Sequence, residues 1–270
     1  MLRRLYRLPA LAALLFGGLA TVFLVFPWLG DPGRERLIAR WSVWLLRVCG
    51  VRVIERPADA VSALSALRGT HGAGAGRLLL VNHVSWLDIF AIQSLAPASF
   101  VAKAEIAGWP LAGTLVARTG TVFIERGRRH AVHGVIQRLG AKLTEGHRAA
   151  VFPEGTTSDG RRLLPFHGNL VQAALNTGVP MIPVGLRYLD PDGEPSHAAM
   201  FVGDTSFLAS LWRITGHPTL LVEVHPLPPI GPAEGLTRQE AARRARAAIS
   251  ARLGLPLEDT VPETLRALRA

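Results

Sequence analysis

The longest uncharged stretch of the chain lies near its N-terminus, where residues 8–30 are mostly apolar. As a helix rising ~1.5 Å per residue, this stretch would extend ~34 Å, enough to cross a hydrocarbon core of ~30 Å. It ends in Phe26, Pro27 and Trp28, a poor context for signal-peptide cleavage and a typical interfacial anchor. We therefore predict a retained membrane helix, which either spans the bilayer or dips into one leaflet.

The next segment, residues 34–48, has an amphipathic pattern. Its apolar residues recur at helical spacing, with arginines between them. The pattern predicts an amphipathic helix among the lipid headgroups, and the alternative is an ordinary helix that faces the protein core. Arg34, Arg36, Arg40 and Arg47 outnumber the arginines before the apolar stretch, so the positive-inside tendency predicts a catalytic domain on the cytoplasmic face of the cell inner membrane.

From residue 77 onward, short apolar runs alternate with helical patterns. We predict strands over 78–82, 121–125, 149–152, 181–187 and 220–224, and helices over 86–95, 131–144, 170–176 and 239–253. Such alternation predicts an α/β fold with a mostly parallel or mixed central sheet flanked by helices. The predicted organisation is a membrane anchor and interfacial helix over 1–50, a linker over 51–76, a catalytic domain over 77–230 and a basic C-terminal helical segment over 231–270.

Composition and charge narrow the function classes. Hydrophobic residues make up 49% of the chain and charged residues 19%, which argues against disorder. The net charge of +10 favours anionic partners such as membrane lipids or phosphorylated substrates. Nucleic acid is not an expected partner, because no recognition motif occurs and aromatic residues are not interleaved with the basic runs. The single cysteine, Cys49, reads as a small buried or lipid-facing residue.

The sharpest chemical signal is the heptapeptide Asn-His-Val-Ser-Trp-Leu-Asp at 82–88, between a predicted strand and a predicted helix. Across such a turn, His83 and Asp88 can approach each other. The carboxylate could hold one ring nitrogen and leave the other basic, which makes His83 a candidate general base. Ser85 and Asp88 also have the spacing of a helix capping box, which needs no catalysis. The pattern alone leaves both interpretations open.

Three further blocks could contribute to a site. Residues 151–160 run from a strand end through Pro-Glu-Gly into glycines and hydroxyl residues, a loop that either binds a phosphate or headgroup or is simply polar. Arg126 follows the predicted strand 121–125 and can grip a phosphate, although an arginine there is usually just solvated. Residues 179–184 could be an edge strand with no further role. Neither a metal-binding His-Glu-x-x-His motif nor a Gly-x-Ser-x-Gly elbow occurs, so no metal site is predicted.

In this order, the four blocks resemble the glycerolipid acyltransferase family, the 1-acylglycerol-3-phosphate acyltransferases. The resemblance covers residues 78–189, and the His-x4-Asp and Phe-Pro-Glu-Gly-Thr blocks together are specific. It implies that His83 is the catalytic base and Asp88 its partner. It also implies an acceptor site formed by Arg126, Glu154, Gly155 and Thr156. Lys103 would add a contact to the phosphate.

One departure concerns the position after Gly155-Thr156, where the family pattern has arginine and this chain has Thr157. A phosphate-binding cation is therefore missing unless Arg161 or Arg162 replaces it. The variant Gly-Thr-Thr-Ser-Asp-Gly is similar to the branch that acylates lyso-ornithine lipids. Lysophosphatidic acid is nevertheless the first expected acceptor, and lyso-ornithine lipid is the alternative.

The resemblance implies that the free hydroxyl of a lysolipid attacks the thioester of acyl-CoA or acyl carrier protein. His83 would take the hydroxyl proton while Asp88 stabilises the imidazolium, with no covalent acyl-enzyme and no cofactor besides the donor. A hypothesis from another class is a basic peripheral membrane protein that binds anionic lipid without chemistry. The sequence makes no prediction about the oligomeric state.

Overall fold

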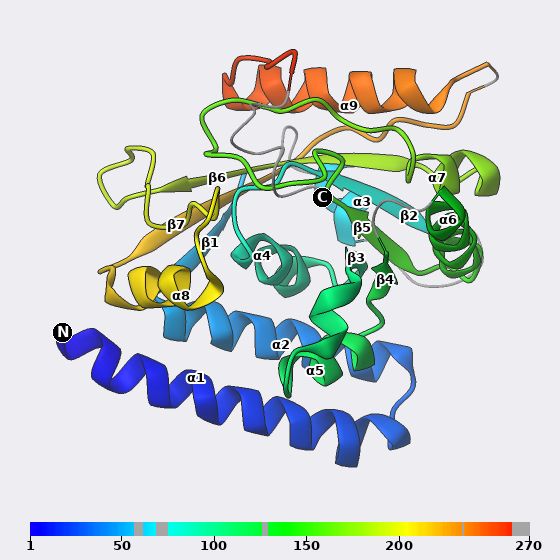
Figure 1. The fold of residues 1–270 in the computed structure, drawn as a ribbon. Helices are drawn as coiled ribbons and strands as arrows, with labels where there is room; N and C mark the ends of the chain where they lie inside the picture. The colour runs from blue at the N-terminus through cyan, green and yellow to red at the C-terminus, as the bar shows by residue number, and fades with distance from the viewer. Residues whose placement is uncertain (57–61, 69–74, 126–128, 234, 261–270) are drawn as a thin grey trace.

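The fold is seen in a computed structural model that describes residues 1–56, 62–68, 75–125, 129–233 and 235–260 (Figure 1). Its centre is a seven-stranded sheet with the order β1-β7-β6-β2-β5-β3-β4. Neighbouring strands are parallel except for the antiparallel pair β6 and β7. The predicted mixed sheet is therefore confirmed. The strands are β1 Val51–Glu55, β2 Arg77–Val81, β3 Ser99–Lys103, β4 Val122–Ile124, β5 Arg148–Val151, β6 Met181–Leu189 and β7 Leu220–Pro226.

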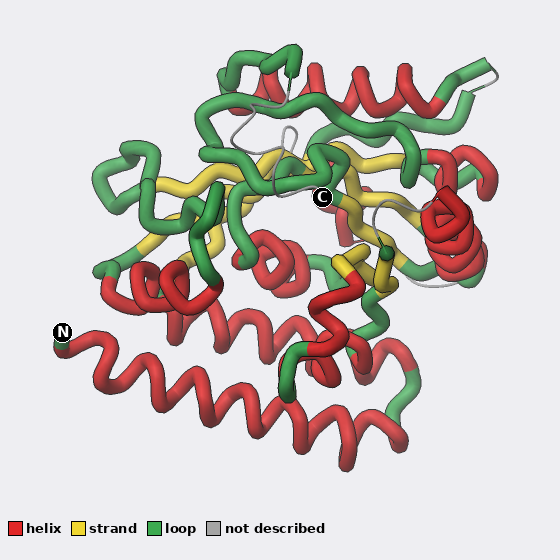
Figure 2. The backbone as a smooth tube through the Cα atoms, in the orientation of Figure 1, coloured by secondary structure: helices red, strands yellow, loops and turns green. Residues whose placement is uncertain are grey.

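Helices cover both faces of the sheet, which Figure 2 shows as one layer of strands between helical layers. The central strands β2, β5 and β6 consist mostly of buried apolar residues, as expected for strands that are covered on both faces. One face packs against α2 (Asp31–Cys49), α4 (Leu87–Leu95) and α8 (Phe207–Gly216). The other packs against α6 (Arg129–Thr144), α7 (Gln172–Thr177) and α9 (Arg238–Leu253). The remaining short helices are α3 Ser62–Arg68, η3 Ala104–Gly108 and α5 Ala112–Arg118.

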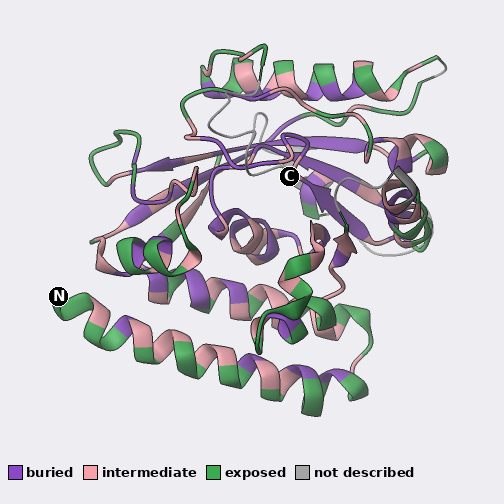
Figure 3. Ribbon diagram, in the orientation of Figure 1, coloured by how far each residue is buried: buried purple, intermediate pink, exposed green. Residues whose placement is uncertain are grey.

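The N-terminal apolar segment forms an outer helix that lies beneath α2 (Figure 1). Helix α1 (Leu2–Ala20) continues through a π-helical turn, η1 (Thr21–Val25), and a 3-10 turn, η2 (Phe26–Trp28). Among the described residues, Leu2–Trp28 is one helix that is long and apolar enough to cross a membrane. Its outward residues are exposed, whereas buried residues run through the sheet and α4 (Figure 3). The predicted apolar helix is therefore present.

Helix α2 faces the protein core along one side, which was one of the two alternatives for residues 34–48. Leu45, Leu46 and Cys49 are buried in the main core, while Arg40 and Trp44 on the same helix are exposed. The other side of the helix is exposed, and its predicted position among lipid headgroups stays a prediction. Cys49 is a small buried residue as expected, and burial raises the pKa of its thiol to about 12.

Two strands were not anticipated. β1 lies within the predicted linker over residues 51–76 and pairs with β7 along its whole length, so part of that segment belongs to the sheet. β3 joins β5 to β4. The sheet order has a direct consequence for function, because β2 and β5 are parallel neighbours. The loops that follow them, which carry residues 82–88 and 152–158, therefore emerge side by side at one edge of the sheet.

Candidate active site

His83 and Asp88 meet in the turn between β2 and α4. The ring Nδ1 of His83 lies 2.8 Å from Oδ2 of Asp88. The same oxygen accepts hydrogen bonds from the backbone N–H groups of Val84 at 2.7 Å and Ser85 at 2.9 Å. Asp88 is completely buried. One carboxylate oxygen therefore holds both the histidine ring and the backbone that leads into α4, so the predicted approach of His83 and Asp88 is confirmed, while the catalytic role of His83 stays a prediction.

The histidine ring is fixed in orientation but remains accessible. It stacks on Phe152 with ring centroids 3.8 Å apart and planes inclined by 10°. Its side chain is 19% exposed. An ionised carboxylate can only accept hydrogen bonds, so Nδ1 carries the hydrogen and the lone pair lies on Nε2. No residue that the structure describes is hydrogen-bonded to Nε2, which leaves this nitrogen able to accept a proton.

Tyr188 on β6 completes the environment of the carboxylate. Its hydroxyl donates to Oδ1 of Asp88 at 2.7 Å, and the residue is only 4% exposed. Burial, and after it the charge of Asp88, raises the pKa of Tyr188 well above its ordinary value. The phenol is therefore a neutral hydrogen-bond donor at any working pH.

The loop after β5 clamps the backbone of His83 from both sides. Oε1 of Glu154 accepts from the His83 N–H at 2.7 Å, and Oε2 accepts from the Leu164 N–H at 3.1 Å. The Ser158 N–H donates to the His83 carbonyl at 2.7 Å. Glu154 is completely buried, and desolvation raises its pKa to about 8 despite the two backbone donors. Its carboxylate thus holds the histidine loop, whereas the resemblance assigned Glu154 to the acceptor site.

The other residues of this loop are placed as follows. Gly155 has φ of 69°, in the left-handed region that favours glycine, and its N–H donates to Phe152 at 3.0 Å. Thr156 and Thr157 are both nearly buried. The Thr157 hydroxyl donates to the Phe201 carbonyl, so the side chain that replaces the family arginine is bonded to the protein itself.

Three predicted cations differ in how far the structure places them. Arg161 is exposed, and its guanidinium contacts Nε2 of His197 at 2.8 Å. Lys103 ends β3 and is half-buried, at the same edge of the sheet as the residues that follow β2 and β5. Arg126 lies outside the described residues. The phosphate contacts predicted for these cations stay predictions.

Sequence reasoning missed two contributors besides Tyr188. The side-chain amide of Asn82 donates to the Leu186 carbonyl at 3.0 Å and accepts from the Leu186 N–H at 2.6 Å. These two hydrogen bonds thus connect the chain to β6 one residue beyond the last paired residue of β2, Val81, and fix where the histidine turn begins. Ser158 was noted only as part of a polar loop. A polar residue at the end of an apolar strand was the available signal for Asn82.

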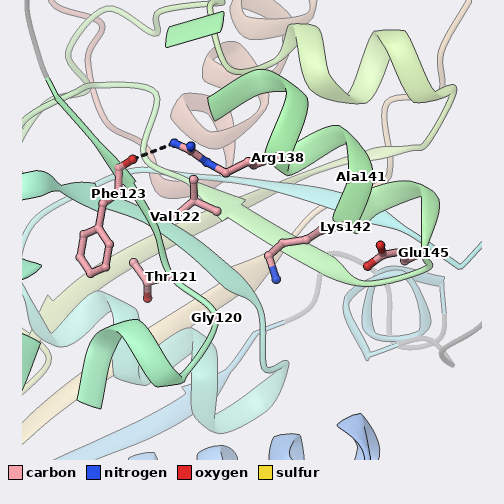
Figure 4. Close-up of a pocket in the computed structure, with 8 residues that line it drawn as sticks. All are labelled: Gly120, Thr121, Val122, Phe123, Arg138, Ala141, Lys142 and Glu145. Carbon is pink, nitrogen blue, oxygen red and sulfur yellow. Dashed lines mark hydrogen bonds between the residues drawn. The ribbon is translucent and has the colours of Figure 1, made fainter. Parts of the chain in front are cut away.

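A cavity of about 600 Å³ lies away from these residues (Figure 4). It is lined by residues before and within β4 and by the C-terminal half of α6, including Arg138 and Lys142. Gly120 and Thr121 precede β4, so the cavity opens near the N-terminal ends of the parallel strands. His83 follows the C-terminal end of β2, at the opposite edge of the sheet. This cavity is therefore distinct from the candidate active site.

Comparisons with known proteins identify related sequences and a structure with a similar fold. The model of the Acyltransferase family matches residues 66–187. A lyso-ornithine lipid O-acyltransferase from Pseudomonas aeruginosa is 39% identical over 218 residues, covering 81% of this chain and 78% of the relative. A 1-acyl-sn-glycerol-3-phosphate acyltransferase from Neisseria gonorrhoeae is 40% identical over 153 residues, covering 55% of this chain and 58% of the relative. The crystal structure of the 1-acyl-sn-glycerophosphate acyltransferase PlsC from Thermotoga maritima has the same fold, with a TM-score of 0.61, 20% identity and coverage of 93% of this chain and 96% of that one.

Proposed function

The chain belongs to the Acyltransferase family, and on this premise we propose that it transfers a fatty acyl group from a thioester donor to the free hydroxyl of a lysolipid. The observation that carries the proposal is the His83–Asp88 pair. Nδ1 is held by a buried carboxylate at 2.8 Å, while the ring remains 19% exposed. This arrangement is suited to a general base that takes a proton from an alcohol.

In the proposed reaction, the lysolipid hydroxyl attacks the carbonyl carbon of the acyl thioester. Its proton moves to Nε2 of His83, and Asp88 stabilises the imidazolium that forms. The tetrahedral intermediate then collapses as the carbon–sulfur bond breaks, and the imidazolium returns the proton to the departing thiolate. General-base catalysis contributes about 10²–10⁴ in rate, and fixing the two reactants side by side contributes about 7–11 kcal/mol more. The donor is acyl-CoA or acyl carrier protein.

We also infer that the molecule lies on a membrane through the face that carries α1. This face supplies the lipid substrate directly to the site. Two observations support it: α1 is long and apolar, and large apolar side chains are exposed on α1, η1, η2, α2 and α8. These include Leu5, Phe16, Leu24, Trp28, Trp44, Leu208 and Trp212. Burying such side chains in lipid is favourable by about 1.5–3 kcal/mol each. The cytoplasmic face of the inner membrane is the proposed location.

For the acceptor, two observations favour lyso-ornithine lipid over lysophosphatidic acid. The relative named for lyso-ornithine lipid matches 81% of this chain, whereas the relative named for 1-acylglycerol-3-phosphate matches 55%. Thr157 stands where the family pattern has a cation, and its hydroxyl is bonded to Phe201. The two arginines that could replace this cation have partners within the protein, since Arg161 contacts His197 and Arg162 contacts Glu258. An ornithine headgroup has no phosphate monoester and does not require that cation.

The test is thiol release by the purified protein in lipid vesicles, with the two acceptors offered separately and matched in acyl chain. We expect thiol release with acyl-CoA or acyl carrier protein, and a kcat/KM at least about tenfold higher for lyso-ornithine lipid, the effect of one lost charged contact. A reversed preference would assign lysophosphatidic acid as the acceptor. Vesicle binding without thiol release from any pair of substrates would instead support a non-catalytic lipid-binding protein.

A further inference from the structure

The two oxygens of the Asp88 carboxylate have different surroundings. Oδ2 accepts three hydrogen bonds, from the His83 ring and two backbone N–H groups. Oδ1 accepts from the Tyr188 hydroxyl at 2.7 Å, and no other donor to Oδ1 is found in the described part of the chain. With Oδ2 facing the ring and Oδ1 facing the phenol, the rotation of the carboxylate about its Cβ–Cγ bond is fixed from both sides.

Tyr188 reaches this position from a distant part of the sequence. It lies 100 residues after Asp88, on the strand that pairs with β2, and its ring belongs to the same buried cluster as Leu87 and Ile92 of α4. A phenol that is 4% exposed, beside a negative charge, remains protonated. It can therefore only donate to Asp88, and it does so without adding a positive charge near the imidazole.

Other charged groups act on this region more remotely. Glu154 interacts electrostatically with Asp88, and Arg246 of α9 interacts with Glu154. Glu154 has both of its oxygens on backbone N–H groups of other residues. Among the described residues, the side chains that are hydrogen-bonded to Asp88 are thus those of His83 and Tyr188.

We propose that Tyr188 is a positioning residue for acyl transfer, whose hydroxyl orients Asp88 toward His83 and limits how strongly the carboxylate attracts the imidazolium. The inference rests on the proposed function, because it takes His83 to be the base. A carboxylate that accepts one hydrogen bond fewer attracts a neighbouring cation more strongly. Removing the hydroxyl should therefore loosen the geometry and also hold the proton on His83 more tightly.

The first test is the pH dependence of kcat/KM for the variant Tyr188→Phe. The ring is kept and one oxygen is lost. We expect kcat to fall by about 10- to 100-fold, the effect of losing a hydrogen bond to a charged group. We also expect the acid limb of the pH profile to move to higher pH by about half a unit or more. A purely structural role in packing would lower stability without moving the acid limb.

The chain offers a matched control because it contains only two tyrosines. Tyr6 on α1 is 59% exposed, so Tyr6→Phe should leave both kcat and the acid limb unchanged. In that background, biosynthetic incorporation of 3-fluorotyrosine modifies position 188 alone. The fluorine makes the phenol more acidic and hence a stronger donor. The acid limb should then move to lower pH, opposite to its movement in Tyr188→Phe.

The outcomes separate the two proposals. Absence of thiol release by the unmodified protein would refute the proposed function itself. The role of Tyr188 would be overturned by a different result. In that case the unmodified protein is active, and Tyr188→Phe has the same kcat and the same acid limb as Tyr6→Phe. If Tyr188→Phe does not fold, the fluorinated protein decides, and an unmoved acid limb there would equally overturn the proposal.

Discussion

Replacing Glu154 with glutamine tests whether this buried carboxylate both clamps the histidine loop and carries a proton near neutral pH. In the native protein its two oxygens accept from the backbone N–H groups of His83 and Leu164. A glutamine side chain has one oxygen and one NH₂ group. One of the two backbone donors would therefore face another donor. A buried donor left without an acceptor costs about 1–3 kcal/mol, which is a large part of a typical folding free energy of about 5–15 kcal/mol.

The pH dependence follows from the raised pKa of Glu154. The folded state binds its proton with a pKa of about 8, against an ordinary value of 4.5. The folded protein therefore holds more protons than the unfolded chain between these values, and its stability falls as pH rises through them. This contribution to the free energy of unfolding is fully present below pH 4.5 and is lost by about pH 8. The loss is at most roughly 5 kcal/mol. Glutamine does not titrate, so the variant lacks this loss.

The assay is thermal or urea unfolding followed by tryptophan fluorescence in detergent, at several pH values from 5 to 8.5. We expect native protein to be more stable than Glu154→Gln at pH 5 by about 1–3 kcal/mol and to lose this advantage as pH rises toward 8, where a native loss larger than that makes the variant the more stable protein. Glu145→Gln is a matched control, because Glu145 is exposed on the protein surface. A difference between native protein and Glu154→Gln that is constant across this range would refute the reasoning, since it would mean that Glu154 is ionised throughout.

Three further changes test other parts of the structure. Asn82→Ala removes both amide contacts with Leu186 and should lower the free energy of unfolding in urea by about 2–4 kcal/mol, since two buried backbone groups lose their partners; an unchanged midpoint would contradict the bridge. Arg7→Met removes hydrogen bonds to three carbonyls at the end of α8 and should increase amide hydrogen exchange in α1 and α8. Unchanged protection from exchange would show that other contacts hold α1 in place. The double variant Trp28→Ser and Trp212→Ser removes two exposed apolar side chains and should lower vesicle partitioning by about 10- to 100-fold per residue, with unaltered partitioning arguing for another membrane face.

The parts of the fold that could be predicted were those with a strong local pattern. β2 and β6 are almost wholly apolar and buried on both faces, so their composition identified them as strands. β1 mixes apolar and charged residues over only five positions, and β3 ends in the half-buried Lys103. Neither short, partly polar run stood out from a linker or loop, because each becomes a strand only through its pairing partner.

The candidate site divides in the same way. The His83–Asp88 contact is local, so the turn that joins their elements was enough to predict it. The Asp88–Tyr188 contact depends on the register between β2 and β6, which a single sequence does not contain. The contacts of Glu154 could not be predicted for a related reason. Its partners are backbone groups, and no pattern of side chains along the chain identifies them.

The central claim is that Nε2 of His83 accepts the proton of a lysolipid hydroxyl, and the most direct measurement is the rate of thiol release by His83→Ala at saturating donor and acceptor. The control is His133→Ala, because His133 is exposed on α6. We predict that His83→Ala loses about 10²- to 10⁴-fold in kcat with unchanged vesicle binding, while His133→Ala keeps the native rate. A His83→Ala protein that retains a rate close to that of the control would contradict the assignment of His83 as the base.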